Sequence, residues 1–478
     1  MEGEEEGEGS NRPWGLYWRS NTSFILSTVT VGMFTDLFLY GLVVPVLPFM
    51  LRDRLAIPEN EIQSYVSNLL AAYAGASVVS SLPAGWIADK LGSRQAPFLG
   101  GLGALLAATI MLAFGRKLVI LVIARLLQGM SAAVVWTVGL AMVIDTVGPQ
   151  DIGKVIGLIF SFISIGGLMS PVIGGILYEK TGYVGVFGIA SSLLGLDFLM
   201  RLVVIEKKTA AKFDNDIPSN PCDFWIRDEG VDAEATEEDA LVPKSDDSTY
   251  KFRGEQSKAI QSLPILACFK DLRFLMTLLL AFVQALLLSA FDATVPTEAQ
   301  SLFDFSSLEA GLLFIALDMP YLVLGPLCGW AVDRYGTKLM AVMGFGYMAP
   351  ALVVLRLVPD ELVSGTRNVV FYCALLALNG IGLAAISSPS IVEASSVVQR
   401  YEKANPGFFG ENGPYAQLYG FNSIFYNAGL ATGPILAGYL KGSLGYGNMN
   451  LVFAVISGIT ATLSFFIVGG KRKVPAGT

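Results

Sequence analysis

The chain has no histidine and few cysteines, which removes several kinds of chemistry at once. Histidine is the commonest protein ligand for transition metals and the usual carrier of protons near neutral pH, so proton chemistry here must use carboxylates. The cysteines show no CxxC or other ligand spacing; they are Cys222, Cys268, Cys328 and Cys373. With no phosphate-binding loop either, we expect no disulfide framework, no metal, no cofactor and no enzymatic activity.

Charged residues are also scarce. They make up 15% of the chain, against 53% hydrophobic residues and a mean hydropathy of +0.58. A water-soluble core with a solvated surface does not have this composition, so we expect a lipid bilayer as the surroundings and no binding of nucleic acid. Residues 1–10 are rich in Glu and Gly and lack the pattern of a signal peptide, so the first apolar stretch is expected to be a retained span.

Apolar runs of about 20 residues, the length that a helix needs to cross hydrocarbon, recur along the chain. The first six are Phe24–Leu51, Ile62–Ile87, Pro97–Phe114, Leu118–Val147, Val155–Leu177 and Val184–Val204. After a polar interval, six more follow at Phe274–Val295, Leu308–Val332, Leu339–Val358, Val369–Val397, Ala416–Leu440 and Leu451–Val468. These runs predict an all-α polytopic membrane protein of twelve transmembrane helices.

Lys and Arg set the orientation, because cytoplasmic loops collect them. With the N-terminus inside, most of them face the cytoplasm and only a few, Lys441 among them, fall outside. The expected organisation is a disordered cytoplasmic N-terminus (1–22), a six-helix bundle (23–206), an acidic cytoplasmic linker (207–265), a second six-helix bundle (266–470) and a basic cytoplasmic tail (471–478). The linker buries too little to offset the entropy of ordering, which favours a plain tether; a regulatory segment around Ser245 and Ser248 is the alternative.

Two motifs occur once in each half. GWIADKLGSR follows the second span with Gly85, Asp89 and Arg94, and GWAVDRYGTK follows the eighth with Gly329, Asp333 and Lys338. In the fifth span Gly157, Gly166, Ser170, Pro171, Gly174 and Gly175 share their spacing with Gly420, Gly429, Gly433, Pro434, Ala437 and Gly438 in the eleventh. Such repetition predicts two pseudo-symmetric six-helix bundles related by duplication.

These residues resemble the major facilitator superfamily. The two GWxxD motifs look like its signature loop, Arg125, Gln128 and Gly129 are similar to its R-x-x-Q-G motif, and the glycines of the fifth span resemble the motif of its antiporters, with Ser170 where that pattern has Gly. Asp36, Val44, Pro45 and Pro48 look like the vesicular amine transporters and the related twelve-span drug:proton antiporters. Acidic residues of the amine carriers match Ile386 and Ser423 here, which favours the drug or metabolite exporters.

Three charged residues are candidates for proton or substrate coupling. Asp36 lies about 12 residues into the first span, roughly 18 Å along a helix, near the bilayer centre. A carboxylate there costs several kcal/mol unless it is paired, protonated or hydrated, so it predicts a proton or cation site; the alternative is a structural bond to a neighbouring helix. Arg125 could bind an anion or modulate a nearby carboxylate, with a structural partner as the alternative. Asp318 is a second candidate for protonation, and the alternative is a polar group satisfied at a helix break near Pro320. Asp292 and Glu393 are weaker candidates, expected near span ends.

Other residues have supporting roles. Polar and aromatic side chains that are candidates to line a central cavity are Tyr73, Gln128, Trp136, Asn379, Asn422 and Tyr426. At the cytoplasmic face, Arg94 is expected to pair with Asp145 and Asp89 to meet a helix N-terminus, in a conformational latch with Gly85 that Gly329, Asp333 and Lys338 repeat; a basic loop that only orients insertion is the alternative. The small residues Gly157, Gly166, Gly174 and Gly175 beside Pro171 are expected to let helices pack closely.

The resemblance and the residues together predict a proton-coupled antiporter. It would export a small, largely hydrophobic organic compound by alternating access, as a monomer, with protons, substrate and lipid as its partners. The plasma membrane is the expected location, ahead of a vesicle or vacuole. A nutrient symporter is one alternative, distinguished by uptake. A receptor or sensor on the same fold is another, and its output would be lost if the linker were removed.

Overall fold

The computed structural model is helical throughout the residues that it describes, which are 13–90, 94–147, 152–210, 213, 250–252, 260, 263–357, 366–405, 408–409 and 415–469. The N-terminal half contains α1 (Leu16–Arg19), α2 (Thr22–Val43), α3 (Leu47–Leu55), α4 (Glu59–Lys90), α5 (Gln95–Phe114), α6 (Leu118–Val147), α7 (Ile152–Val203) and α8 (Lys207–Ala210). The C-terminal half contains η3 (Pro264–Lys270), α11 (Leu272–Phe303), α12 (Ser307–Tyr335), α13 (Thr337–Val354), η4 (Leu355–Leu357), α14 (Thr366–Ile386), α15 (Pro389–Ala404), α16 (Tyr415–Leu444) and α17 (Tyr446–Ile467).

The predicted twelve crossings are confirmed. Within the described ranges, nine helical segments are long and apolar enough to span a membrane. One of them, α7, contains two crossings, because Gly182 with φ 64° and ψ −161° reverses the chain inside it. The more polar helices α4 and α16 supply the other two, and they lie against each other.

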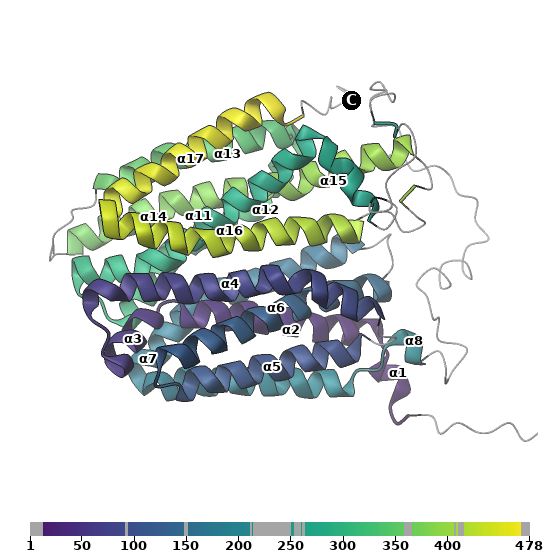
Figure 1. Cartoon of the computed structure of the whole chain (residues 1–478), viewed down its shortest axis with the longest axis horizontal. Coiled ribbons are helices and arrows are strands. Elements are labelled where there is room, and N and C mark those ends of the chain that lie inside the picture. Colours follow the sequence, from purple (N-terminus) through teal and green to yellow (C-terminus); the bar gives the residue numbers. More distant parts are fainter. Residues whose placement is uncertain are drawn as a thin grey trace, which may run out of the picture.

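The helices form two bundles that correspond to the two halves of the sequence (Figure 1). In the N-terminal bundle α2 packs on α6 and α7, while α4 packs on α6. In the C-terminal bundle α11 packs on α16, and α13 packs on α17. The bundles meet along two seams, α4 with α16 and α7 with α12. Each seam therefore joins a helix of one repeat to a helix of the other.

Proline interrupts two of the predicted spans. The first is divided into α2 and α3 around Pro45, which has no N–H to donate to the helix. The tenth is divided into α14 and α15, and Pro389 occupies the first turn of the second piece. The apolar runs are continuous in sequence at both places, so hydropathy alone predicts a single helix there.

Within the segment 1–22, predicted to be disordered, the structure describes the residues from Pro13 onward and places α1 there. Arg19 Nε donates to the carbonyl of Val203 at 2.6 Å, and the backbone N–H of Ile205 donates to the carbonyl of Arg19 at 3.0 Å. These bonds hold α1 against the end of α7. Four helical residues are too few for a periodic signal, which is why composition predicted disorder.

Both ends of the predicted linker are attached to the bundles. Residues 207–210 form α8, and Phe252 N donates to Asn405 Oδ1 at 3.0 Å while Asn405 Nδ2 donates to the carbonyl of Tyr250 at 2.8 Å. The boundary drawn at 207–265 therefore includes structured residues on each side. Ser245, Ser248, Cys222 and the tail 471–478 lie outside the described residues.

Glycines allow the helix backbones of each bundle to touch. A Cβ at Gly174 would lie 2.1 Å from the carbonyl oxygen of Leu42 on α2, and one at Gly166 would lie 2.5 Å from the ring of Phe34. In the other bundle a Cβ at Gly429 would lie 2.2 Å from the carbonyl oxygen of Phe282 on α11. At these positions a side chain larger than hydrogen would collide with the neighbouring helix. The side-chain surroundings of Gly157 lie outside the description.

Ser170, the departure from the glycine motif, is matched by a glycine opposite it. A Cβ at Gly41 on α2 would lie 2.1 Å from Ser170 Oγ. In the C-terminal bundle the arrangement is reversed, because a Cβ at Gly433 would lie 2.2 Å from Ser289 Oγ on α11. Each bundle thus places one hydroxyl against one glycine, from opposite helices.

Exchange of the two side chains tests this packing. Gly41→Ser should lower the free energy of unfolding by about 1–3 kcal/mol, because two hydroxymethyl groups would compete for one space. The double variant with Ser170→Gly should regain most of that loss, since it reproduces the arrangement of Ser289 and Gly433. Thermal unfolding in detergent measures both; a double variant no more stable than Gly41→Ser would contradict the proposed complementarity.

Candidate functional site

The centre of the N-terminal bundle holds a buried carboxylate. Asp36 on α2 is 2% exposed, and its Oδ2 accepts hydrogen bonds from Tyr73 Oη at 3.0 Å and Trp136 Nε1 at 2.9 Å. Its second oxygen, Oδ1, is buried and has no hydrogen-bond partner. An unsatisfied oxygen in the interior is costly, so this atom is the natural place for a proton or a cationic group.

The glycine of the R-x-x-Q-G motif positions the two side chains that donate hydrogen bonds to Asp36. A Cβ at Gly129 on α6 would lie 1.9 Å from the carbonyl oxygen of Tyr73 on α4. Only glycine permits the two backbones to approach so closely. This contact fixes the distance between the helices that carry Tyr73 and Trp136, and thereby the hydrogen bonds to Asp36.

Arg125 is buried on the same helix, at 1% exposure. Its Nη1 donates to Gln128 Oε1 at 3.2 Å, while Nε and Nη2 have no hydrogen-bond partner. The guanidinium interacts electrostatically with the hydroxyls of Tyr40 and Tyr73. Arg125 is therefore brought to the side chains around Asp36, and two of its nitrogens are available to donate to an acceptor.

The C-terminal bundle contributes a second acidic site, which the sequence interpretation underestimated. Asp292 was expected near the end of its span, but α11 continues to Phe303 and leaves Asp292 in the middle of the helix. Tyr40 Oη on α2 donates to Asp292 Oδ2 at 3.1 Å, across the boundary between the bundles. Asp318 on α12 is half-buried and interacts electrostatically with Asp292.

Aromatic side chains connect the two acidic sites. The rings of Tyr40 and Tyr73 lie 5.1 Å apart, centroid to centroid. Each hydroxyl donates to a different carboxylate, Tyr73 to Asp36 and Tyr40 to Asp292. Tyr426 on α16 is half-buried and interacts electrostatically with Asp292. Asp36, Tyr73 and Trp136 are thus joined by hydrogen bonds, whereas Arg125, Asp318 and Tyr426 lie within electrostatic range of Tyr40, Tyr73 or Asp292.

Two of the predicted cavity residues make other contacts. Asn379 is fully buried and donates to the carbonyls of Ala351 on α13 and Leu375 on its own helix, so it joins α14 to α13 inside the bundle. Asn422 accepts from Ser390 Oγ at 3.1 Å and joins α16 to α15. The structure does not bring either amide to Asp36. A single sequence does not show which face of a helix is turned inward.

Glu393 has a structural role at the end of the C-terminal bundle. It accepts a hydrogen bond from Thr337 Oγ1 at the start of α13 and one from Gly469 N at 3.1 Å, just beyond α17. The carboxylate therefore joins the ends of two helices and lies apart from the central carboxylates.

The cytoplasmic latch stays a prediction. The side chains of Asp89, Asp145 and Asp333 lie outside the described residues. Arg94 precedes α5, and the Nζ of Lys338 lies 5.0 Å from the centre of the Phe465 ring. The two motif glycines sit in ordinary contact with other helices: a Cβ at Gly85 would lie 3.4 Å from Thr137, and one at Gly329 would lie 3.8 Å from Ser388.

Family comparison agrees with this architecture. The model of the Major Facilitator Superfamily matches residues 29–410 and 274–478. The chain belongs to the major facilitator superfamily. It is a multi-pass membrane protein of the transporter type.

Curated relatives are transporters of the same superfamily. MFS-type transporter ppzB of Metarhizium rileyi is 51% identical over 475 residues, covering 97% of this chain and 98% of the relative. The uncharacterized MFS-type transporter C18.02 of Schizosaccharomyces pombe is 39% identical over 425 residues, covering 88% and 90%. The vesicular acetylcholine transporter of Tetronarce californica is 22% identical over 483 residues, covering 94% and 81%.

Solved structures share the fold at low sequence identity. The nucleoside transporter NupG aligns with a TM-score of 0.64 at 13% identity, covering 93% of this chain and all of NupG. The human organic anion transporter MFSD10 aligns with a TM-score of 0.56 at 16% identity, covering 93% and 99%. These likenesses confirm the all-α fold of two six-helix bundles.

Two substitutions separate central residues from packing residues. Tyr40→Phe should lower transport efficiency by roughly tenfold, because it removes a hydrogen bond to a carboxylate, while the fold is retained. Asn379→Ala should lower the free energy of unfolding by about 1–2 kcal/mol and leave substrate affinity unchanged. Thermal unfolding and concentration-dependent flux measure the two effects. The reverse pattern would show that the central assignment is wrong.

Proposed function

We propose that this chain is a proton-coupled antiporter that exports a small, largely hydrophobic organic compound by alternating access. The observation that carries the proposal is the carboxylate of Asp36, buried at mid-span with one oxygen hydrogen-bonded twice and the other unpartnered. We further propose that it acts as a monomer at the plasma membrane.

The chemistry of a buried carboxylate supports exchange. In the membrane interior an ionised carboxylate costs several kcal/mol unless it is paired, protonated or hydrated. Tyr73 and Trp136 satisfy Oδ2, which leaves Oδ1 to be satisfied by a proton or by a cationic part of a substrate. Because the two compete for one atom, binding of either releases the other. This competition is the basis of antiport.

Charge at the centre favours some substrates over others. Asp36, Asp292 and Asp318 supply carboxylates, against the guanidinium of Arg125. The rings of Tyr40 and Tyr73 lie between Asp36 and Asp292, and the indole of Trp136 donates to Asp36. Carboxylates beside aromatic faces suit hydrophobic cations and neutral aromatic compounds better than organic acids.

Proton movement in sealed proteoliposomes tests the proposal. With a panel of hydrophobic cations, neutral drugs and organic acids, the wild-type chain should show substrate-dependent proton counterflow, and Asp36→Asn should abolish it. Asp53→Asn is the matched control, since it makes the same change in a carboxylate that is 47% exposed. Control flux should match that of the wild type.

Other outcomes would revise the mechanism in defined ways. Substrate flux without proton movement would overturn antiport and retain the carrier. Unaltered coupling in Asp36→Asn would overturn the assignment to Asp36, and Asp318→Asn would then be the variant to compare. Proton movement in the same direction as substrate would identify a symporter.

A further inference from the structure

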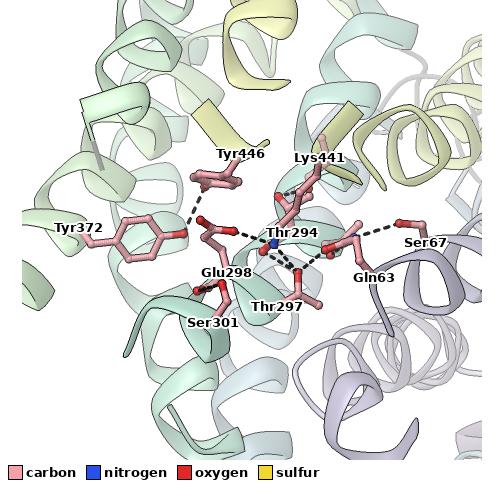
Figure 2. A network of polar contacts seen from close by, with 11 residues as sticks. Gln63, Ser67, Thr294, Thr297, Glu298, Ser301, Tyr372, Lys441 and Tyr446 are labelled. Carbon is pink, nitrogen blue, oxygen red and sulfur yellow. Dashed lines mark hydrogen bonds and ion pairs between the residues drawn. The ribbon is translucent and has the colours of Figure 1, made fainter. Parts of the chain in front are cut away.

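A buried ion pair lies at the end of the C-terminal bundle that the predicted topology places outside. Lys441 Nζ on α16 is 2.7 Å from Glu298 Oε2 on α11, and the two side chains are 15% and 6% exposed (Figure 2). Tyr446 on α17 lies beside the pair, with its ring centre 5.6 Å from the ammonium. Its hydroxyl is 3.2 Å from that of Tyr372 on α14. Four helices of one bundle thus enclose the pair.

Hydrogen bonds extend from this ion pair into the other bundle. Lys441 Nζ donates to Thr297 Oγ1 at 2.9 Å, and Thr297 Oγ1 in turn donates to Gln63 Oε1 on α4 (Figure 2). Gln63 Nε2 donates to the carbonyl of Ala293 at 2.9 Å and to Ser67 Oγ at 3.1 Å. One amide from the N-terminal bundle is therefore held by two groups of α11.

The charge of Lys441 fixes the direction of these bonds. An ammonium can only donate, so Thr297 Oγ1 must accept from it; the single hydrogen of this hydroxyl is then shared between Gln63 Oε1 and the carbonyl of Thr294, which lies 3.0 Å away. With its oxygen engaged, Gln63 presents its NH₂ group to the carbonyl of Ala293. Glu298 neutralises the ammonium within its own bundle. The ion pair thus orients a cross-bundle contact without crossing the boundary itself.

Close contacts at two glycines lie beside the same end of the molecule. A Cβ at Gly438 on α16 would lie 2.2 Å from Ser67 Oγ on α4. On the second seam, a Cβ at Gly175 on α7 would lie 2.3 Å from the carbonyl oxygen of Ser307, at the start of α12. At this end, therefore, the helices of both seams lie in close contact.

We propose that Gln63, Thr297 and Ala293 form an outer gate between the bundles. Gln63 is the side chain that moves, and the Thr297 hydroxyl and the Ala293 carbonyl form the fixed socket that receives it. Lys441 and Glu298 orient this socket. When the bundles separate on the outside, Gln63 leaves and water takes its hydrogen bonds. The ion pair stays closed because α11 and α16 pack together in one bundle. The inference rests on alternating access in the proposed function and is independent of proton coupling and of the substrate.

Accessibility from outside tests the gate. The native cysteines are replaced, and Ser307→Cys serves as the reporter, since Ser307 is 3% exposed and lies on the other seam, away from Gln63. Gln63→Leu should raise the rate of labelling by a membrane-impermeant maleimide roughly tenfold, the shift expected when two ordinary hydrogen bonds are lost. The matched control is Gln300→Leu on α11, a half-buried glutamine beyond the socket.

A second variant addresses the role of the ion pair. Thr297→Val keeps the shape of the side chain and leaves Lys441 paired with Glu298, but it removes the hydroxyl that connects them to Gln63. It should raise labelling roughly threefold, less than Gln63→Leu does, because the bond from Gln63 to the carbonyl of Ala293 remains. The double variant should label no faster than Gln63→Leu, because both substitutions interrupt one path. Additive effects would overturn the directed path through Thr297.

The result separates this proposal from the proposed function. Labelling needs neither a proton gradient nor a substrate, so it reports on the gate even if the chain proves not to be an antiporter. Unchanged labelling in Gln63→Leu, or an equal rise in Gln300→Leu, would overturn the gate. Intact exchange alongside unchanged labelling would overturn the gate alone.

Discussion

Backbone contact at glycine is the interaction on which the rest of this structure depends. In lipid, helices gain little from burying apolar side chains against each other, so association relies on close packing and polar contacts. Gly129 brings α6 against Tyr73, and Gly174 brings α7 against α2. Gly175 and Gly438 do the same between bundles. The distances among the central polar groups follow from these contacts.

The central polar groups gain their importance from lying on both bundles. Asp36 belongs to one bundle and Asp292 to the other, and the Tyr40 hydroxyl crosses between them. A rotation of one bundle against the other changes this bond before it changes the bonds around Asp36, which lie within a single bundle. In the proposed antiport mechanism, Tyr40 would connect the movement of the bundles to the occupancy of the carboxylates. Contacts confined to one bundle, such as that of Asn379, are not changed by a rotation of the bundles.

Much of the fold could be predicted because the constraint of the bilayer is local in sequence. Length and apolarity predicted the crossings, and repeated glycines predicted the close contacts. Pairings between distant residues could not be predicted. The sequence placed Lys441 on the outer side, but it did not show that Lys441 pairs with Glu298 on another helix. The sequence interpretation placed Asp292 near a span end, because the apolar run stops at Val295 while the helix continues.

The opposite placement of serine and glycine in the two bundles has a consequence for their history. Ser170 on α7 faces Gly41, whereas on the equivalent helix of the other bundle Gly433 faces Ser289. The same space has been filled from opposite sides since the two copies diverged. A chimera that put the segment around Ser170 in place of the segment around Gly433 would set hydroxyl against hydroxyl, and the reverse graft would leave a void. The two repeats still share an architecture, but a segment of one repeat can no longer replace the matching segment of the other.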